Sequence, residues 1–104
     1  MPRMPKPYDR FRKQYPEVWN AYDQMGVAAH AAGPLDAKTR EVVKLALAIG
    51  AQLEGAVHSH VRKAVEAGVT PAEIRQVAVL ALPTIGFPRM MAALTWIDDV
   101  LAKK

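Results

Sequence analysis

The chain has 104 residues, of which 51% are hydrophobic, and it carries a formal net charge of +4 and no cysteine. The length suits a single domain, and the lack of cysteine excludes disulfides, thiolate metal sites and cysteine-based redox chemistry. Since there is neither an apolar signal segment nor a run of the ~20 apolar residues that a membrane span needs, we expect a cytoplasmic protein without membrane segments.

The positive charge is concentrated at the N-terminus. Residues 1–14 hold five basic side chains against Asp9 alone, whereas the rest of the chain is balanced. Three prolines fall within the first seven residues, so the start of this segment is expected to be loosely ordered. We interpret 1–14 as a basic, proline-rich arm, either solvated or strapped across a neighbouring subunit, ahead of a single helical domain over 15–104. A nucleic-acid-binding protein more typically carries a basic stripe on a folded face, so nucleic acid is not the favoured partner.

The first half of the chain predicts three helices. Pro16 can open a helix over 16–32, which ends at Gly-Pro. A helix over 36–52 has Asp36 as its N-cap and is apolar almost all round in its second half, which is typical of a buried helix. A third helix over 53–67 ends before Gly68. No strong turn signal separates the second helix from the third.

The second half predicts two more helices and no strand. Thr70 and the residues after it form a capping box with a proline at the first helical position, which opens a helix over 71–82. Pro83 ends that helix, residues 84–88 are expected to be a loop, and the last helix covers 88–104. The fold class is therefore all-α, a compact bundle of five to six helices with short connections.

Polar residues in the stretch EGAVHSH divide between two faces of the third helix. At 100° per residue, Leu53, Ala56 and His60 share one face, and His58 points away from His60 by about 160°. Glu54 and His58 are an i, i+4 pair on the other face. The two histidines therefore do not share a metal ion, and we predict no metal site. The alternatives to catalysis are structural. His60 would be a core histidine bonded to a backbone carbonyl or a nearby acid, and His58 a surface histidine in a charge ladder with Glu54 and Arg62.

Glu41 strengthens the functional interpretation of His60. It lies near the start of the most apolar helix, where a carboxylate is partly desolvated unless it is paired. A carboxylate beside an imidazole is a common pair for moving protons near neutral pH. A carboxylate in the first turns, paired with Lys38 or Lys44, is the structural alternative.

Residues 35–94 resemble the carboxymuconolactone decarboxylase superfamily, which also contains the alkyl hydroperoxidase D proteins. The resemblance rests on LDAKTRE, HVRKAVEAG, TPAEI and GFP, all present in this order. The peroxidase branch has a motif of Glu, eleven residues, Cys, two residues, Cys, three residues, His. Placed on this chain from Glu41, the motif puts Leu53 and Ala56 at the cysteine positions and His60 at the histidine position.

The missing thiols redirect the expected chemistry. Leucine and alanine cannot act as nucleophiles, so thiol peroxidase activity is not expected. The resemblance then implies a decarboxylase-like enzyme that uses neither metal nor cofactor. His60 would be its general acid/base and Glu41 its partner, with Glu54 and His58 as secondary candidates. Decarboxylation also needs a cation for the substrate carboxylate, and Arg40, Arg62 and Arg89 are candidates for this role.

Two classes of function stay open at this point. One is a cofactor-independent lyase acting on a small carboxylated or lactone-like substrate. The other is a non-catalytic oligomer, either a small-ligand binder or a redox-pathway partner that kept the fold and lost the thiols. In both cases the resemblance implies a homo-oligomer, a trimer or a hexamer, and the apolar content of so short a chain agrees with burial between subunits.

Overall fold

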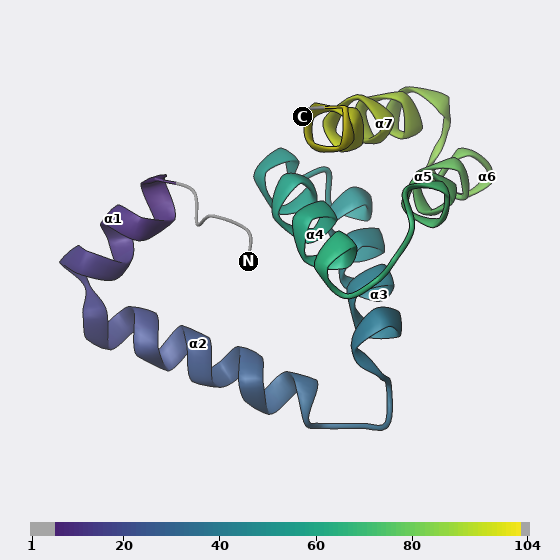
Figure 1. The fold of residues 1–104 in the computed structure, drawn as a ribbon. Helices are drawn as coiled ribbons and strands as arrows, with labels where there is room; N and C mark the ends of the chain where they lie inside the picture. Colours follow the sequence, from purple (N-terminus) through teal and green to yellow (C-terminus); the bar gives the residue numbers. More distant parts are fainter. Residues whose placement is uncertain (1–5, 103–104) are drawn as a thin grey trace. The chain divides into compact units, whose positions relative to one another are not determined.

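The computed structural model describes residues 6–102, and these residues fold into helices without any strand (Figure 1). The all-α prediction is confirmed. Seven helices follow one another in the described segment: α1 Lys6–Gln14, α2 Pro16–His30, α3 Ala37–Gly50, α4 Glu54–Glu66, α5 Pro71–Val79, α6 Leu82–Ile85 and α7 Phe87–Leu101. The first five residues and the last two lie outside the described part.

The chain divides into two compact units, one up to Leu35 and one from Asp36 onward. The first unit holds α1 and α2, which only Tyr15 separates. Residues 6–14 of the predicted arm are thus helical, and Asp9 pairs there with Arg12 and Lys13 at 2.6 and 3.1 Å. None of the described residues of α1 or α2 is buried. The predicted division into 1–14 and 15–104 stays a prediction.

The second unit begins with a hairpin of α3 and α4. Asp36 caps α3 as predicted, since its side chain accepts a hydrogen bond from the Thr39 amide at 2.8 Å. After α3 the chain turns through Gln52, a non-glycine residue with φ of 56°. The Gln52 amide bonds to Ile49 O and the Leu53 amide to Ala48 O, which is the Schellman pattern that usually requires glycine.

The Gln52 side chain compensates for this backbone conformation. Its amide donates to Ile49 O at 2.9 Å and to Arg89 O at 3.4 Å, so it ties the turn to the start of α7. The sequence has only a weak turn signal here, although the chain turns sharply at Gln52. This turn fixes the register of α4 against α3.

Pro83 was predicted to end a helix, but it lies in the first turn of a short helix instead. The predicted helix over 71–82 is shorter, because α5 ends at Val79. Leu82, Pro83 and the first two residues of the loop predicted over 84–88 form the one-turn helix α6. Proline is tolerated there because it occupies the first turn, where its missing N–H has no helical partner. The Thr70 capping box is present in full, with both of its hydrogen bonds to Glu73.

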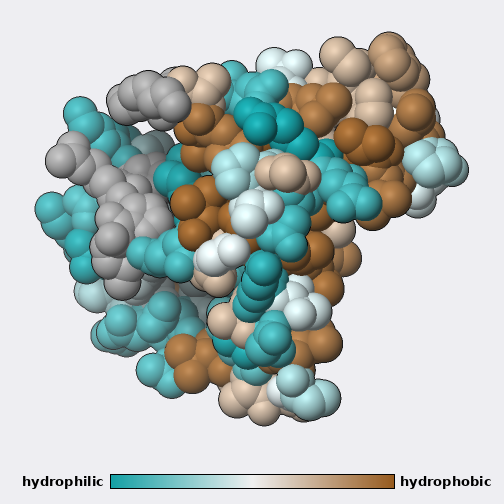
Figure 2. Space-filling model, turned by 45° about the vertical axis from the view of Figure 1, so that its right-hand side comes forward, coloured by the Kyte–Doolittle hydropathy of each residue, from teal (hydrophilic) through white to brown (hydrophobic). Residues whose placement is uncertain are grey.

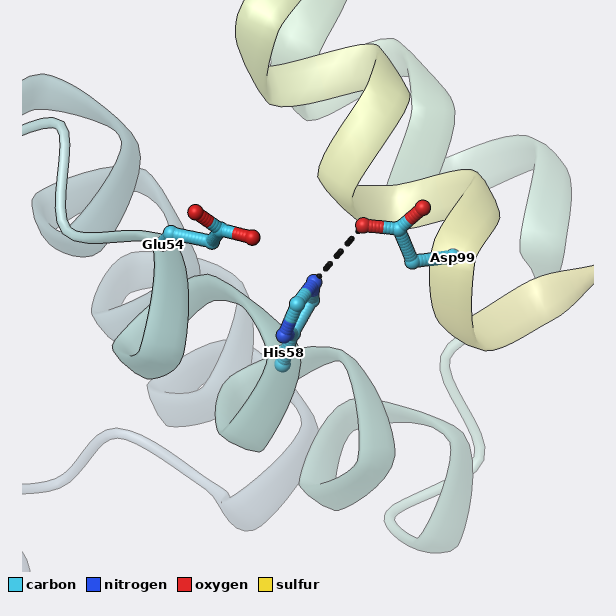
Figure 3. Close-up of side chains that lie close together, drawn as sticks. All are labelled: Glu54, His58 and Asp99. Atoms are coloured by element: carbon cyan, nitrogen blue, oxygen red, sulfur yellow. Dashed lines mark hydrogen bonds and ion pairs between the residues drawn. The ribbon is translucent and has the colours of Figure 1, made fainter.

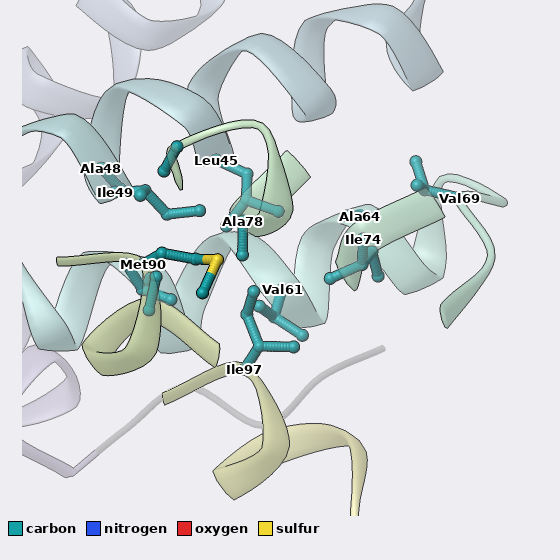
Figure 4. Close-up of a cluster of buried hydrophobic side chains, with 13 residues drawn as sticks. Leu45, Ala48, Ile49, Val61, Ala64, Val69, Ile74, Ala78, Met90 and Ile97 are labelled. Carbon is teal, nitrogen blue, oxygen red and sulfur yellow. The ribbon is translucent and has the colours of Figure 1, made fainter. Parts of the chain in front are cut away.

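The core lies within the second unit (Figure 4). Helix α4 packs against α3 and α7, and α5 packs against α7 and α3. Leu45, Ile74 and Ile97 are fully buried, and each such side chain contributes about 1.5–3 kcal/mol through burial. Among the described residues from 36 to 102, the buried side chains are apolar apart from one carboxylate, Glu41. That exception defines the candidate site.

Large hydrophobic side chains also remain at the surface of the second unit, and Figure 2 shows such patches in brown. The most exposed are Leu47 at 67%, Leu80 and Phe87 at 58%, and Leu53 at 54%. Helix α3 is thus buried on one face and apolar but open on the other. Within residues 6–102, no helix has the length and apolar character required to cross a membrane.

Candidate functional site

The α3–α4 hairpin brings Glu41 and His60 together. Glu41 lies in the second turn of α3 and His60 lies in α4, on the face that was predicted to carry reactive groups. His60 Nδ1 is 3.5 Å from Glu41 Oε1, and the two side chains are 17% and 10% exposed. This distance is long for a hydrogen bond, so the contact is an ion pair when the ring is protonated. The structure thus brings together the two residues that sequence reasoning paired, and their role in a site stays a prediction.

Both facing atoms of this pair are buried without a hydrogen bond. Within the described part of the chain, neither Glu41 Oε1 nor His60 Nδ1 has a hydrogen-bond partner. Leaving a buried polar group without a partner costs about 1–3 kcal/mol, so nearly all such groups in proteins are satisfied. A small approach of the two side chains, or a bound molecule between them, would satisfy both atoms.

The electrostatic surroundings keep the His60 ring neutral. Burial is the largest effect and lowers the pKa of His60, and the positive charge of Lys63 lowers it further. Glu41 opposes these effects and raises the pKa, and Lys44 adds a smaller lowering effect. Burial therefore outweighs the carboxylate, and near pH 7 the ring is ready to accept a proton rather than to give one.

Sequence reasoning considered only arginines as anion holders, so it took Lys44 solely as a salt-bridge partner of Glu41 and did not consider Lys63. Lys63 lies one turn after His60 on α4, and Lys44 lies one turn after Glu41 on α3. Both lower the pKa of His60, and Arg40, Arg62 and Arg89 are not among the charged groups that chiefly shift it. Each lysine follows a member of the pair by three residues, a spacing that places the two side chains next to each other on a helix. This spacing could have identified both lysines as neighbours of the pair.

His58 belongs to a different cluster (Figure 3). Its Nε2 atom lies 2.9 Å from Asp99 Oδ2 of α7. The charge ladder expected for His58 on α4 therefore extends to a residue of another helix. One ligand atom from each of Glu54, His58 and Asp99 lies within 4.8 Å of the others, so this trio could hold a metal ion. Asp99 was not predicted, because no local spacing relates it to α4.

An apolar groove lies away from the Glu41–His60 pair. It is lined by residues of α3, α5 and α6 and of the connection between the last two, including Ile49, Val77, Leu80 and Ile85. Neither Glu41 nor His60 lines it. This groove has no acid–base group and is suited to an apolar side chain or ligand.

Comparisons with known proteins found a matching family model and a curated relative. The family model described as the carboxymuconolactone decarboxylase family matches residues 14–99. An uncharacterized protein of Haemophilus influenzae is 39% identical over 59 residues, which is 57% of this chain and 52% of that protein. The chain thus spans about half the length of this curated relative. No solved structure matches the chain significantly.

Proposed function

Because the chain belongs to the carboxymuconolactone decarboxylase family, we propose that it is an acid–base enzyme of the lyase type that needs no cofactor. Its substrate would be a small carboxylated or lactone-like molecule, and His60 and Glu41 would carry the proton transfer. The observation that supports this proposal is the buried pair whose facing atoms, Nδ1 and Oε1, lack hydrogen bonds. Buried polar atoms without partners cost stability, and perturbed titratable groups cluster at functional sites.

The pair assigns different roles to its two members. Glu41 faces Nδ1 and would hold the proton on that nitrogen, which leaves Nε2 as the basic atom for the substrate. On loss of carbon dioxide, the electrons of the broken carbon–carbon bond pass to the substrate carbon, and that carbon takes a proton from the ring. The neutral ring must first take up this proton from solvent at Nε2, and it returns to the neutral state after the transfer, so the net reaction consumes one proton. The lowered pKa of His60 makes the protonated ring a stronger acid toward the substrate carbon.

Lys63 is the favoured holder of the substrate carboxylate. It is exposed, one helical turn from His60, and close enough for its charge to influence the ring. Arg40, Arg62 and Arg89 stay as candidates from the sequence. Replacing Lys63 by glutamine should raise KM more than it lowers kcat, since the cation binds the carboxylate before and during the reaction. The same replacement at each arginine ranks the four cations.

The proposal is tested by carbon dioxide release from carboxymuconolactone and related unsaturated lactone acids. We expect His60→Gln to lower kcat by about 10²–10⁴-fold, the usual range for a general acid/base. Glu41→Gln should lower kcat as well, and Asp98→Asn, which removes an exposed ion pair with Arg75 between α7 and α5, should not. Wild-type turnover equal to that of His60→Gln on every substrate would overturn the proposal.

The second candidate is a non-catalytic binder or redox-pathway partner that kept the fold. The apolar groove lined by Ile49, Val77 and Leu80 favours it, since the groove is separate from the acid–base pair. Binding of a small apolar acid that is unchanged by His60→Gln, together with the absence of turnover, would identify this function.

Assembly and location complete the proposal. We propose that the protein is a homo-oligomer, a trimer or a hexamer, because Leu47, Leu80 and Phe87 are more than half exposed in the single chain. Multi-angle light scattering should give a mass three or six times that of the chain, and a monomer at micromolar concentration would count against it. A cytoplasmic location is part of the proposal and can be checked by cell fractionation.

A further inference from the structure

A cluster of metal-ligand groups joins α4 to α7, apart from the Glu41–His60 pair. Glu54 and His58 are one turn apart on α4, and Asp99 faces them from α7 (Figure 3). We propose that Glu54, His58 and Asp99 bind a divalent first-row metal ion of the zinc type. The inference departs from the sequence-based expectation of no metal site, and it does not rest on the proposed reaction.

The distances fit a metal after small shifts, in which His58 and Asp99 move slightly apart and Glu54 moves closer. In a tetrahedral zinc site with bonds of about 2.0–2.2 Å, ligand atoms lie about 3.3–3.6 Å from one another. His58 Nε2 and Asp99 Oδ2 are 2.9 Å apart, and all three candidate ligand atoms lie within 4.8 Å. Glu54 is exposed, so rotation of its side chain can close the remaining distance. The metal would replace the His58–Asp99 hydrogen bond with two coordination bonds.

The charge at this cluster also favours a cation. Glu54 and Asp99 place two carboxylates beside one imidazole. Among residues 6–102, neither carboxylate forms an ion pair with a lysine or an arginine. The adjacent Asp98, by contrast, bonds to Arg75 at 3.0 Å. Like charges at this separation repel, and a divalent cation would remove that repulsion.

The ligand types narrow the choice of metal. One imidazole and two carboxylates suit zinc, cobalt, nickel or manganese better than calcium, which prefers six or more oxygen ligands. Three protein ligands leave at least one coordination position for water. The ion would hold α4 against α7, the two helices whose packing includes buried Val61 and Ile97. Its effect should therefore be visible in stability as well as in binding.

The test is titration of the tag-free, EDTA-treated full chain with zinc chloride by calorimetry. We expect one zinc ion per chain and a higher thermal unfolding midpoint in its presence. With cobalt instead, visible absorption bands should appear and saturate at the same ratio. Glu54→Gln keeps the His58–Asp99 hydrogen bond and should fold normally, yet it should weaken zinc binding at least about tenfold.

Matched variants separate this site from adventitious binding. His58→Ala and Asp99→Asn should abolish the cobalt bands, with helical content checked by circular dichroism. Asp98→Asn, one residue away on the same helix, should leave both affinity and bands unchanged, as should His60→Gln. The absence of saturable binding in the wild type, or equal binding in wild type and Glu54→Gln, would overturn the inference and leave the His58–Asp99 contact as a hydrogen bond between helices.

Discussion

Replacing Glu41 by glutamine should make the fold more sensitive to mild acid. Glu41 raises the pKa of His60 against the stronger effect of burial, so its removal lowers that pKa further. At 3.5 Å, a carboxylate and an imidazolium attract by about 1.2 kcal/mol at the dielectric constant of water and by about 4.7 kcal/mol at an effective value of ~20. The pair is largely buried, so the effect lies between these limits.

The sign of the stability change follows from proton linkage. Because the pKa of His60 is lowered in the folded protein, the unfolded chain binds the proton more tightly, and stability falls as the pH drops below about 6.5. For one histidine that stays neutral when folded, the loss between pH 6.5 and 5 is at most about 2 kcal/mol. We expect Glu41→Gln to approach this limit, the wild type to lose less, and His60→Gln to lose none through this residue.

Urea unfolding at pH 7.5, 6.5, 5.5 and 5 gives the free energy of unfolding as a function of pH. Comparing the slopes of these curves removes the pH-independent cost of each substitution. NMR titration of the metal-free protein in EDTA shows whether the His60 ring causes this pH dependence. Glu66→Gln, on the same helix, serves as the control and should leave the slope unchanged. The carboxylates of Asp36 and Glu73 have lowered pKa values and lose their contribution only at more acidic pH, so they do not obscure this window. An unchanged slope in Glu41→Gln, or a shift in the His58 signal instead, would refute the pair.

Three other outcomes test the structure more broadly. Peroxide consumption with a dithiol donor should equal background, and Leu53→Cys combined with Ala56→Cys should create measurable consumption, because the glutamate and histidine of the peroxidase motif are in place. Thr70→Ala should cost about 1 kcal/mol of unfolding free energy in urea, the usual loss for a helix cap. Ile97→Ala should cost about 2–5 kcal/mol, seen as a lower midpoint in thermal unfolding, because its side chain is fully buried.

Local signals made most of the fold predictable. The caps at Asp36 and Thr70 act within four residues, so they could be identified without tertiary information. The end of α3 could not, because the left-handed position is Gln52 rather than glycine and its stabilising contacts reach α7. Pro83 was misread because proline stops a helix in its interior but can start one.

The candidate site was predictable in part. Glu41 and His60 were paired from their spacing relative to a known motif, and helical geometry placed His60 on a different face from His58. Their distance of 3.5 Å and the dominance of burial over the carboxylate depend on packing, which spacing does not encode. Asp99 is 41 residues from His58 in the chain, so only the packing of α7 against α4 reveals their contact.

The lack of buried residues in α1 and α2 has a consequence for amide hydrogen exchange. Helices of 9 and 15 residues are marginal on their own in water, so their amides should exchange within seconds in an isolated chain. Amides next to Leu45 and Ile97 should exchange only through global unfolding. Slow exchange in Lys6–His30 would therefore indicate that another surface packs against these helices. If the exchange slows further as the protein concentration rises, a second copy of the chain supplies that surface.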